Sequence, residues 1–139
     1  MEIIANALQT VELNQNVVFT DTMVCGNNSI IHRAGSGQIT MRGITNQCRA
    51  RFRATFNGNI AIPAAGTVGE ISLAIAVDGE AIGPATMIVT PAVVEEFWNV
   101  ASSVFIDVPA CCCASVSVRN TSDQAIDVQN ANLIVERVA

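Results

Sequence analysis

Short apolar segments separated by turn residues fill the second half of the sequence, and they limit the possible folds more than any other feature. From residue 69 onward these segments are interrupted at Asp78-Gly79, Gly83-Pro84, Pro91, Pro109 and Asn120-Thr121-Ser122. Closely spaced apolar runs that end at Gly, Pro, Asn or Asp are typical of all-β proteins. About ten such segments occur along the chain, which predicts an antiparallel two-sheet jelly-roll sandwich in one domain.

Two stretches show the strand pattern most clearly. Between residues 47 and 56, Cys, Ala and Phe alternate with Arg and other polar residues, which is the period of a half-buried strand. Between residues 71 and 78, the side chains opposite the apolar face are small rather than polar. We therefore expect both faces of this second strand to be covered, one by the other sheet and one by another subunit. Asp78-Gly79 then predicts a tight hairpin turn.

Breaks in the pattern predict where other strands end. Asn57-Gly58-Asn59 predicts a bulge or turn, and the C-terminal region predicts two strands, 125–128 and 131–138. The segment 90–103 fits two structures. We favour a turn at Thr90-Pro91, an irregular stretch and then a strand; the alternative is a single helical turn with Pro91 at its first position.

The composition favours an oligomer. Half of the residues are hydrophobic and only 14% are charged, against about a quarter in an average soluble domain. A small monomer with so few charges leaves apolar patches exposed, and such patches mark subunit interfaces. The net charge is −5 and no Lys is present, which argues against direct binding of nucleic acid because that binding depends on neutralising phosphates.

The N-terminal residues carry no basic region before their short apolar stretch, so no secretory signal is predicted. No apolar run approaches the length of about 20 residues that crosses a bilayer as a helix. We therefore expect a protein that is made in the cytoplasm and has no membrane partner.

Five cysteines are present: Cys25, Cys48, Cys111, Cys112 and Cys113. They form no CxxC pair, and consecutive residues of a strand point in opposite directions, so the triplet does not predict a metal site. We expect small, reduced and buried side chains, because free Cys is among the most buried residue types. The alternative is a metal or disulfide cluster where identical strands of several subunits meet.

No catalytic constellation is evident, and we expect neither an enzyme nor a cofactor. Arg49, Arg51 and Arg53 line one strand face, where pairing with acidic residues on neighbouring strands is a simpler interpretation than an anion or acidic-sugar site. His32 has no nucleophile motif around it and is expected to be structural. Glu95-Glu96 beside Phe97-Trp98 resembles a sugar-stacking edge, but adjacent carboxylates on a strand cannot flank one bond. Trp98 is predicted to be a core or interface anchor.

The stretch from residue 32 to 43, HRAGSGQITMRG, together with the alternating strand after it, resembles the tumour-necrosis-factor/C1q-like jelly rolls. The C-terminal NLIVERV, residues 132–138, is similar to the closing central strand of that family. The resemblance covers the chain from about residue 17 to its end. It implies a homotrimer whose apolar inner sheets surround a threefold axis.

Residues 66–92 and 120–138 also resemble small bacterial and prophage-encoded structural proteins. This resemblance implies a capsid decoration or fibre-head protein on the virion surface, made in the host cytoplasm, with copies of itself and the major capsid or other virion proteins as partners. Residues 1–13 are predicted to form an anchoring arm or edge strand, and residues 14–139 the jelly roll. The candidate interface residues are Ile3, Ile4, Leu8, Ile71, Leu73, Ile75, Trp98, Leu133 and Val135. The alternatives are a tail-tip or bacterial surface module that binds a glycan or protein receptor, and an enzyme with a metal at the cysteine triplet.

Overall fold

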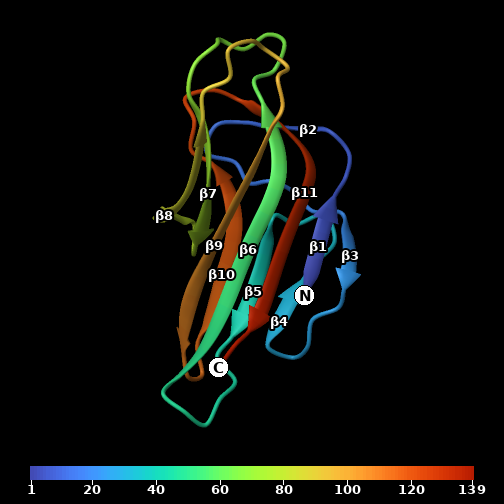
Figure 1. Cartoon of the computed structure of the whole chain (residues 1–139). Helices are drawn as coiled ribbons and strands as arrows, with labels where there is room; N and C mark the ends of the chain where they lie inside the picture. Colours follow the sequence, from blue (N-terminus) through green and yellow to red (C-terminus); the bar gives the residue numbers. More distant parts are fainter.

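Two antiparallel β-sheets packed face to face form the protein, and the computed structural model describes all residues from 1 to 139 (Figure 1). The first sheet contains β1 (Glu2–Ala5), β2 (Gln9–Val11), β3 (Asp21–Val24), β6 (Arg49–Ala61), β9 (Trp98–Pro109) and β11 (Ile126–Arg137). Its strand order is β3-β1-β11-β6-β9, and β2 pairs with the part of β11 that β1 leaves free.

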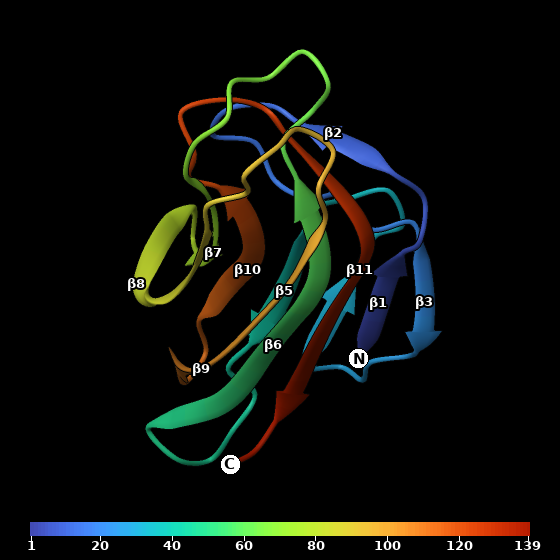
Figure 2. The ribbon, with the colours of Figure 1, turned by 45° about the horizontal axis from the view of Figure 1, so that its top comes forward.

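The second sheet lies behind the first, and its edge strand β8 curls away from the sandwich (Figure 2). It contains β4 (Ile30–His32), β5 (Gln38–Arg42), β7 (Ile71–Val77), β8 (Glu80–Val89) and β10 (Cys113–Asn120), in the order β4-β5-β10-β7-β8. The predicted all-β, two-sheet sandwich is confirmed, with eleven strands. No helix is present that is long and apolar enough to cross a membrane.

The core between the sheets is built from alternating strand residues, and β6 shows how the sequence specifies it. Phe52, Ala54 and Phe56 point inward and are fully buried, whereas Arg53 points outward and is exposed. The alternation predicted for residues 47 to 56 is therefore confirmed from Arg49 onward, whereas Cys48 lies before the strand and is exposed. Fully burying one such large side chain contributes about 1.5–3 kcal/mol to folding.

β6 is longer than its sequence pattern predicts, because Asn57-Gly58-Asn59 continues the strand to Ala61. The irregularity lies on the partner strand β11, where Asn130 has a positive φ of 55° and the register with β6 shifts between Gln129 and Asn132. An extra residue on one strand of an antiparallel pair is a β-bulge. The two predicted C-terminal strands are consequently one strand with a bulge.

β7 is buried on both faces within one chain. Ile71, Leu73 and Ile75 face the core, and the opposite side chains Ser72 and Ala74 are also buried. Ser72 Oγ lies 2.6 Å from Thr121 Oγ1, so neighbouring segments of the same chain cover this side. The expectation that another subunit covers one face of this strand is corrected, because the fold closes both faces by itself.

The N-terminal residues are part of the first sheet. β1 lies between β11 and β3, and the side chain of Ile3 is completely buried. The N-terminal ammonium group donates a hydrogen bond of 2.7 Å to the carbonyl oxygen of Val135. Removing this segment would therefore remove core side chains together with strand pairing.

The loop between β8 and β9 contains bends and turns and no helix, and β9 begins at Trp98. The irregular stretch followed by a strand agrees with the favoured interpretation of residues 90–103, but the turn lies at Val94-Glu95 and not at Thr90-Pro91. The backbone N–H of Glu95 donates a 2.8 Å hydrogen bond to the carbonyl oxygen of Ile62, which holds the loop against the end of β6. The hairpin predicted at Asp78-Gly79 is also present, with positive φ at both residues, as a type I′ turn requires.

Candidate interaction surfaces

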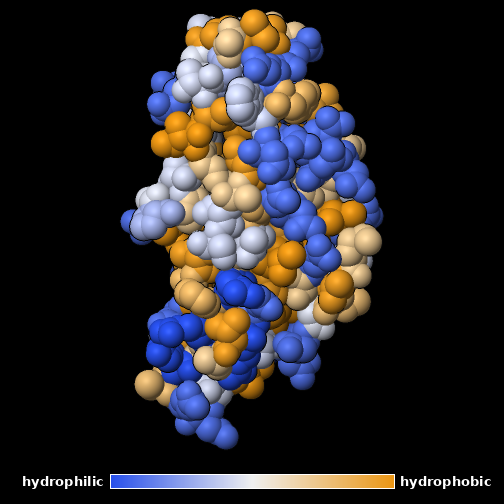
Figure 3. Space-filling model, viewed as in Figure 1, coloured by the Kyte–Doolittle hydropathy of each residue, from blue (hydrophilic) through white to orange (hydrophobic).

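The outer face of the first sheet is an open surface about as long as the molecule, and Figure 3 views the molecule from this side. Its side chains alternate with the core residues of β1, β11, β6 and β9. Ile134, Thr55 and Ser103 lie in one row across three strands, with 3.1 Å between Thr55 Oγ1 and Ser103 Oγ. Phe105 on the edge strand β9 is 61% exposed. Short polar and apolar side chains thus share this face.

Charged residues gather at one end of this face, visible as the most hydrophilic patch in Figure 3. Arg51 donates two hydrogen bonds to the Asp107 carboxylate, 2.7 Å from Nε to Oδ1 and 3.0 Å from Nη2 to Oδ2. Arg49 Nε lies 3.2 Å from Asp107 Oδ2, and Arg53 pairs with Glu136 on β11. The expected cross-strand pairing of the three arginines is confirmed. All three guanidinium groups are held by carboxylates, but Arg49 and Arg51 share Asp107, so one positive charge remains in excess at this end.

The Arg51–Asp107 pair gives a testable titration. The hydrogen bond from Arg51, more than any other interaction, holds the pKa of the Asp107 carboxyl below its ordinary value. Replacing Arg51 with Gln is expected to move this pKa back toward the ordinary value, as measured by NMR titration of the carboxyl carbon. Because the folded-state pKa is lowered, the pair stabilises the fold above the unfolded-state pKa of Asp, and this stabilisation disappears as the pH falls through the folded-state pKa. An unchanged titration of Asp107 in R51Q would contradict the assignment.

A cluster of asparagines on the same face escaped prediction. Asn99 Nδ2 donates to Asn57 Oδ1 at 2.8 Å and to Asn59 Oδ1 at 3.1 Å. In the sequence, Asn57 and Asn59 flank Gly58, and this composition predicts a turn. In the folded chain the same spacing places both amides on the outward side of a continuous strand. The cluster fixes side chains on this face without contributing charge.

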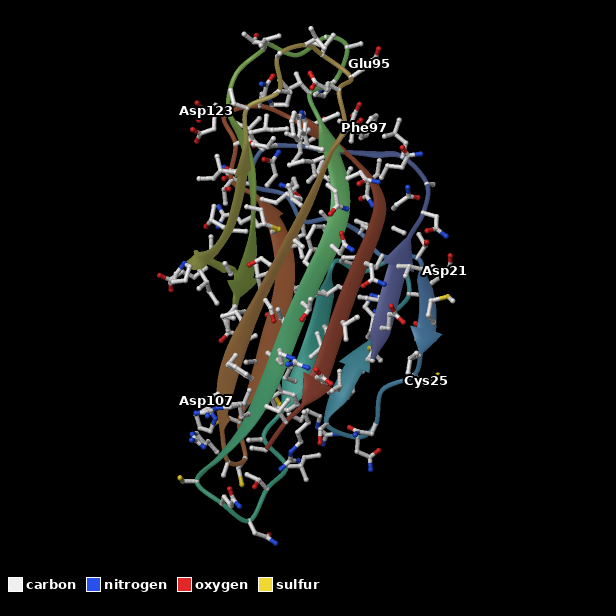
Figure 4. All side chains as sticks on the ribbon, viewed as in Figure 1. Asp21, Cys25, Glu95, Phe97, Asp107 and Asp123 are labelled. Atoms are coloured by element: carbon white, nitrogen blue, oxygen red, sulfur yellow. The ribbon has the colours of Figure 1, made fainter.

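The opposite end of the molecule is formed by loops with exposed apolar side chains. Phe97 and Glu95 lie at this end in Figure 4, and Val68 and Val93 on the neighbouring loops are also exposed. Trp98 is 45% exposed, so the part of its prediction that places it in the core is wrong. It stands at the first position of β9, where the sandwich no longer covers the ring. Aromatic and carboxylate side chains therefore meet solvent together at the loop end.

His32 lies half-buried in the hairpin between β4 and β5, where its Nε2 is 3.0 Å from the carbonyl oxygen of Ser36. This contact joins the two ends of the turn, which agrees with the structural role predicted for it. No three His, Cys, Asp or Glu side chains converge in a way that could hold a metal ion.

The cysteines differ most from their prediction. All five are free and exposed, so the expectation of buried side chains is wrong. Four of them lie at the same end of the molecule as Asp107: Cys48 immediately precedes β6, Cys111 and Cys112 lie in the connection from β9 to β10, and Cys113 begins β10. Cys25 lies apart, after β3 (Figure 4). Their exposure follows from their positions at strand ends and turns, where neither sheet covers a side chain.

The nine candidate interface residues occupy different environments. Six are completely buried and line the core of the single chain: Ile3, Ile71, Leu73, Ile75, Leu133 and Val135. Ile4 is half-buried on the outer face of the first sheet, and Leu8 and Trp98 are exposed. Only these last three offer side-chain surface to another molecule.

No protein-family model and no curated protein matches the chain. Among solved structures, the globular domain of zebrafish complement 1qA protein aligns over 96% of this chain and 93% of its own, with a TM-score of 0.63 and 11% identity. The fold is a C1q-like jelly roll. The CBM35 domain from Cellvibrio japonicus Abf62 covers 100% of this chain and 99% of its own, with a TM-score of 0.44 and 8% identity. The C-terminal domain of the sugar-binding protein EclA covers 95% of this jelly roll and 80% of its own chain, with a TM-score of 0.42 and 14% identity.

Proposed function

We propose that the protein is a non-enzymatic structural protein that forms a homotrimer and packs on the surface of a bacteriophage particle, as a capsid decoration or fibre-head protein. The observation that carries this proposal is the apolar surface left on a single chain. Fourteen large apolar side chains are between 38% and 63% exposed, against only seven Arg and twelve Asp or Glu residues in the whole sequence. Apolar surface of this extent favours association with other copies.

The outer face of the first sheet is the surface best suited to such an association. Its arginines are held in cross-strand pairs with one positive charge in excess, so a partner needs to supply little counter-charge. Ile4, Ile134 and the exposed Phe105 provide apolar contacts, and apolar and aromatic side chains are enriched at the centres of interfaces. The resemblance to trimeric jelly rolls supports a threefold arrangement.

The role on a phage particle is supported by the resemblance of residues 66–92 and 120–138 to prophage-encoded structural proteins. Leu8, exposed between β1 and β2, is the surface residue of the N-terminal segment that such a particle contact could use. Because β1 and β2 carry core side chains, attachment is better tested by Leu8→Asp than by deleting the segment. Loss of particle binding by a folded L8D variant would support the contact, and unchanged binding would remove it.

The oligomer is tested by light scattering at micromolar concentration. The wild-type protein is expected to have three times the chain mass of 14.6 kDa. Phe105→Asp is expected to shift it toward the monomer, because a charge would replace an apolar contact. The matched control is Ile88→Asp on β8 of the second sheet, which is exposed to the same degree, 60%, and should leave the mass unchanged. A monomeric wild-type protein would overturn the proposal.

A second candidate function is a binding module that recognises a glycan through the loop end. The observation in its favour is the exposure of Trp98 and Phe97 beside the carboxylate of Glu95. Aromatic rings presented to solvent beside polar groups offer a sugar both an apolar surface and hydrogen bonds. Specific signals on a glycan array that Trp98→Ala abolishes would favour this function, and an array without signals would exclude it for the glycans presented.

A further inference from the structure

The end of the molecule that carries four exposed thiols is held rigidly. The backbone N–H of Ala110 donates to the carbonyl oxygen of Cys48 at 3.0 Å, which extends the pairing of β6 with β9 to the thiol end. The turn from Pro109 to Cys112 is closed by a 3.1 Å hydrogen bond from the Cys112 N–H to the Pro109 carbonyl oxygen. The thiols therefore project from fixed backbone positions and not from a loose tail.

A second pair of hydrogen bonds fixes this turn to the neighbouring strand. Cys111 N–H donates to the Gly43 carbonyl oxygen at 3.0 Å, and Gly43 N–H donates to the Cys112 carbonyl oxygen at 2.8 Å. These contacts align β10 with β5, so that Cys113 and Arg42 are direct cross-strand partners. Cross-strand partners share one face of a sheet, with Cβ atoms about 4.5–5.5 Å apart.

Arg42 differs from Arg49, Arg51 and Arg53 because it has no carboxylate partner. It is exposed, and one of its N–H groups, on Nη1, donates to the carbonyl oxygen of Asn28 at 3.2 Å. Beside it lies a shallow hollow of about 120 Å³ that is lined by Arg42, Gly43, Ile44 and the three consecutive cysteines. An exposed thiol, an unpaired guanidinium and a hollow thus occur together at one place.

We propose that Cys113 is a site of reversible S-thiolation by a low-molecular-weight disulfide that bears carboxylates, with Arg42 binding a carboxylate of the incoming molecule. The Cys113 thiolate attacks one sulfur of the disulfide, and the second sulfur leaves as a thiolate. A mixed disulfide forms at Cys113 while the disulfide bond of the reagent breaks. The departing thiolate takes up the proton that the Cys113 thiol lost. No other oxidant is needed, and the planar guanidinium matches the two oxygens of a carboxylate.

Cys111 and Cys112 line the same hollow, but only Cys113 is the cross-strand partner of Arg42. The two thiols outside the hollow lack an available guanidinium. Cys48 precedes Arg49, whose guanidinium is already paired with Asp107. Cys25 lies outside every strand and has no cross-strand arginine. Cys25 therefore serves as an internal standard, an exposed thiol in the same molecule without a neighbouring guanidinium. The proposal for Cys113 does not depend on the oligomeric state of the protein.

The experiment compares glutathione disulfide, which carries carboxylates, with cystamine, which is cationic and has similar alkyl thiol chemistry. Modification of each cysteine is quantified by peptide mass spectrometry. For each cysteine we take the ratio of its modification rate with glutathione disulfide to its rate with cystamine. This ratio is expected to be about two- to fivefold higher at Cys113 than at Cys25, which is the range that an exposed charge pair supports. This preference should disappear in Arg42→Gln, remain in part in Arg42→Lys, and weaken at about 0.5 M salt.

Two controls separate electrostatic guidance from a structural effect. Arg42→Gln should leave the cystamine rate at Cys25 unchanged and lower the thermal unfolding midpoint only slightly, since Arg42 is exposed and loses one hydrogen bond to Asn28 and no ion pair. Cys113→Ser should remove the charge-selective adduct while Cys25 still reacts. Equal charge preference at Cys113 and Cys25, or a preference that survives Arg42→Gln, would overturn the proposal.

Discussion

Replacing Phe52 with alanine is expected to destabilise the fold by about 3–5 kcal/mol, a large part of the stability of a domain of this size. Phe52 is completely buried on β6, which lies between β11 and β9 in the first sheet. Its ring fills space between two sheets whose backbones are fixed by hydrogen bonds on both sides of β6. The core can therefore collapse only slightly around the cavity that Phe52→Ala leaves. For this reason the expected loss of unfolding free energy is at the high end for a large-to-small substitution.

The measurement is urea unfolding followed by far-ultraviolet circular dichroism at matched protein concentration. Phe97→Ala is the matched control, because it removes the same side chain from the exposed loop end and is expected to cost about 1 kcal/mol or less. Equal losses for the two variants would show that Phe52 does not form the centre of the core.

The sequence predicts the burial of Phe52 because an alternation with a period of two separates the inward face of β6 from its outward face. Phe52 and Phe56 alternate with arginine and threonine, and only one register of β6 buries the aromatic rings. The same pattern cannot say what covers an apolar face. The pattern predicts Leu73 and Ile75 at a contact between copies, yet the sheets of one chain bury them fully.

The cysteines show a different limit of sequence reasoning. Burial statistics for free Cys describe an average over many positions, whereas exposure here is decided by where a strand ends. Cys111 lies in the turn between β9 and β10 with a positive φ of 65°, and its side chain is exposed because the turn lies beyond the ends of both strands. The pairing of Cys113 with Arg42 depends on the register of β5 and β10, residues 71 apart in sequence, and no local pattern encodes that register.

Gly43→Ala is expected to produce the second largest effect, a loss of about 2–4 kcal/mol in unfolding free energy. A Cβ at position 43 would lie 2.1 Å from the carbonyl oxygen of Pro109 and 3.3 Å from that of Cys112. Both obstacles are backbone atoms of a turn that is itself hydrogen-bonded to Gly43, so a side-chain rotation cannot relieve the overlap. The turn must move away, and the two hydrogen bonds that join it to Gly43 lengthen or break.

Gly69→Ala is the matched control, since a Cβ there would meet no atom within 4 Å and should change stability by less than about 1 kcal/mol. Stability is measured by urea unfolding, and exposure of the β9–β10 turn by amide hydrogen exchange at Cys111 and Cys112. Faster exchange at the turn in Gly43→Ala, with protection of β6 retained, would show that the close approach at Gly43 holds the thiol end in place. If Gly43→Ala and Gly69→Ala were equally stable and equally protected, the turn would not depend on this contact, and the fixed geometry of Cys113 and Arg42 would lose its physical basis.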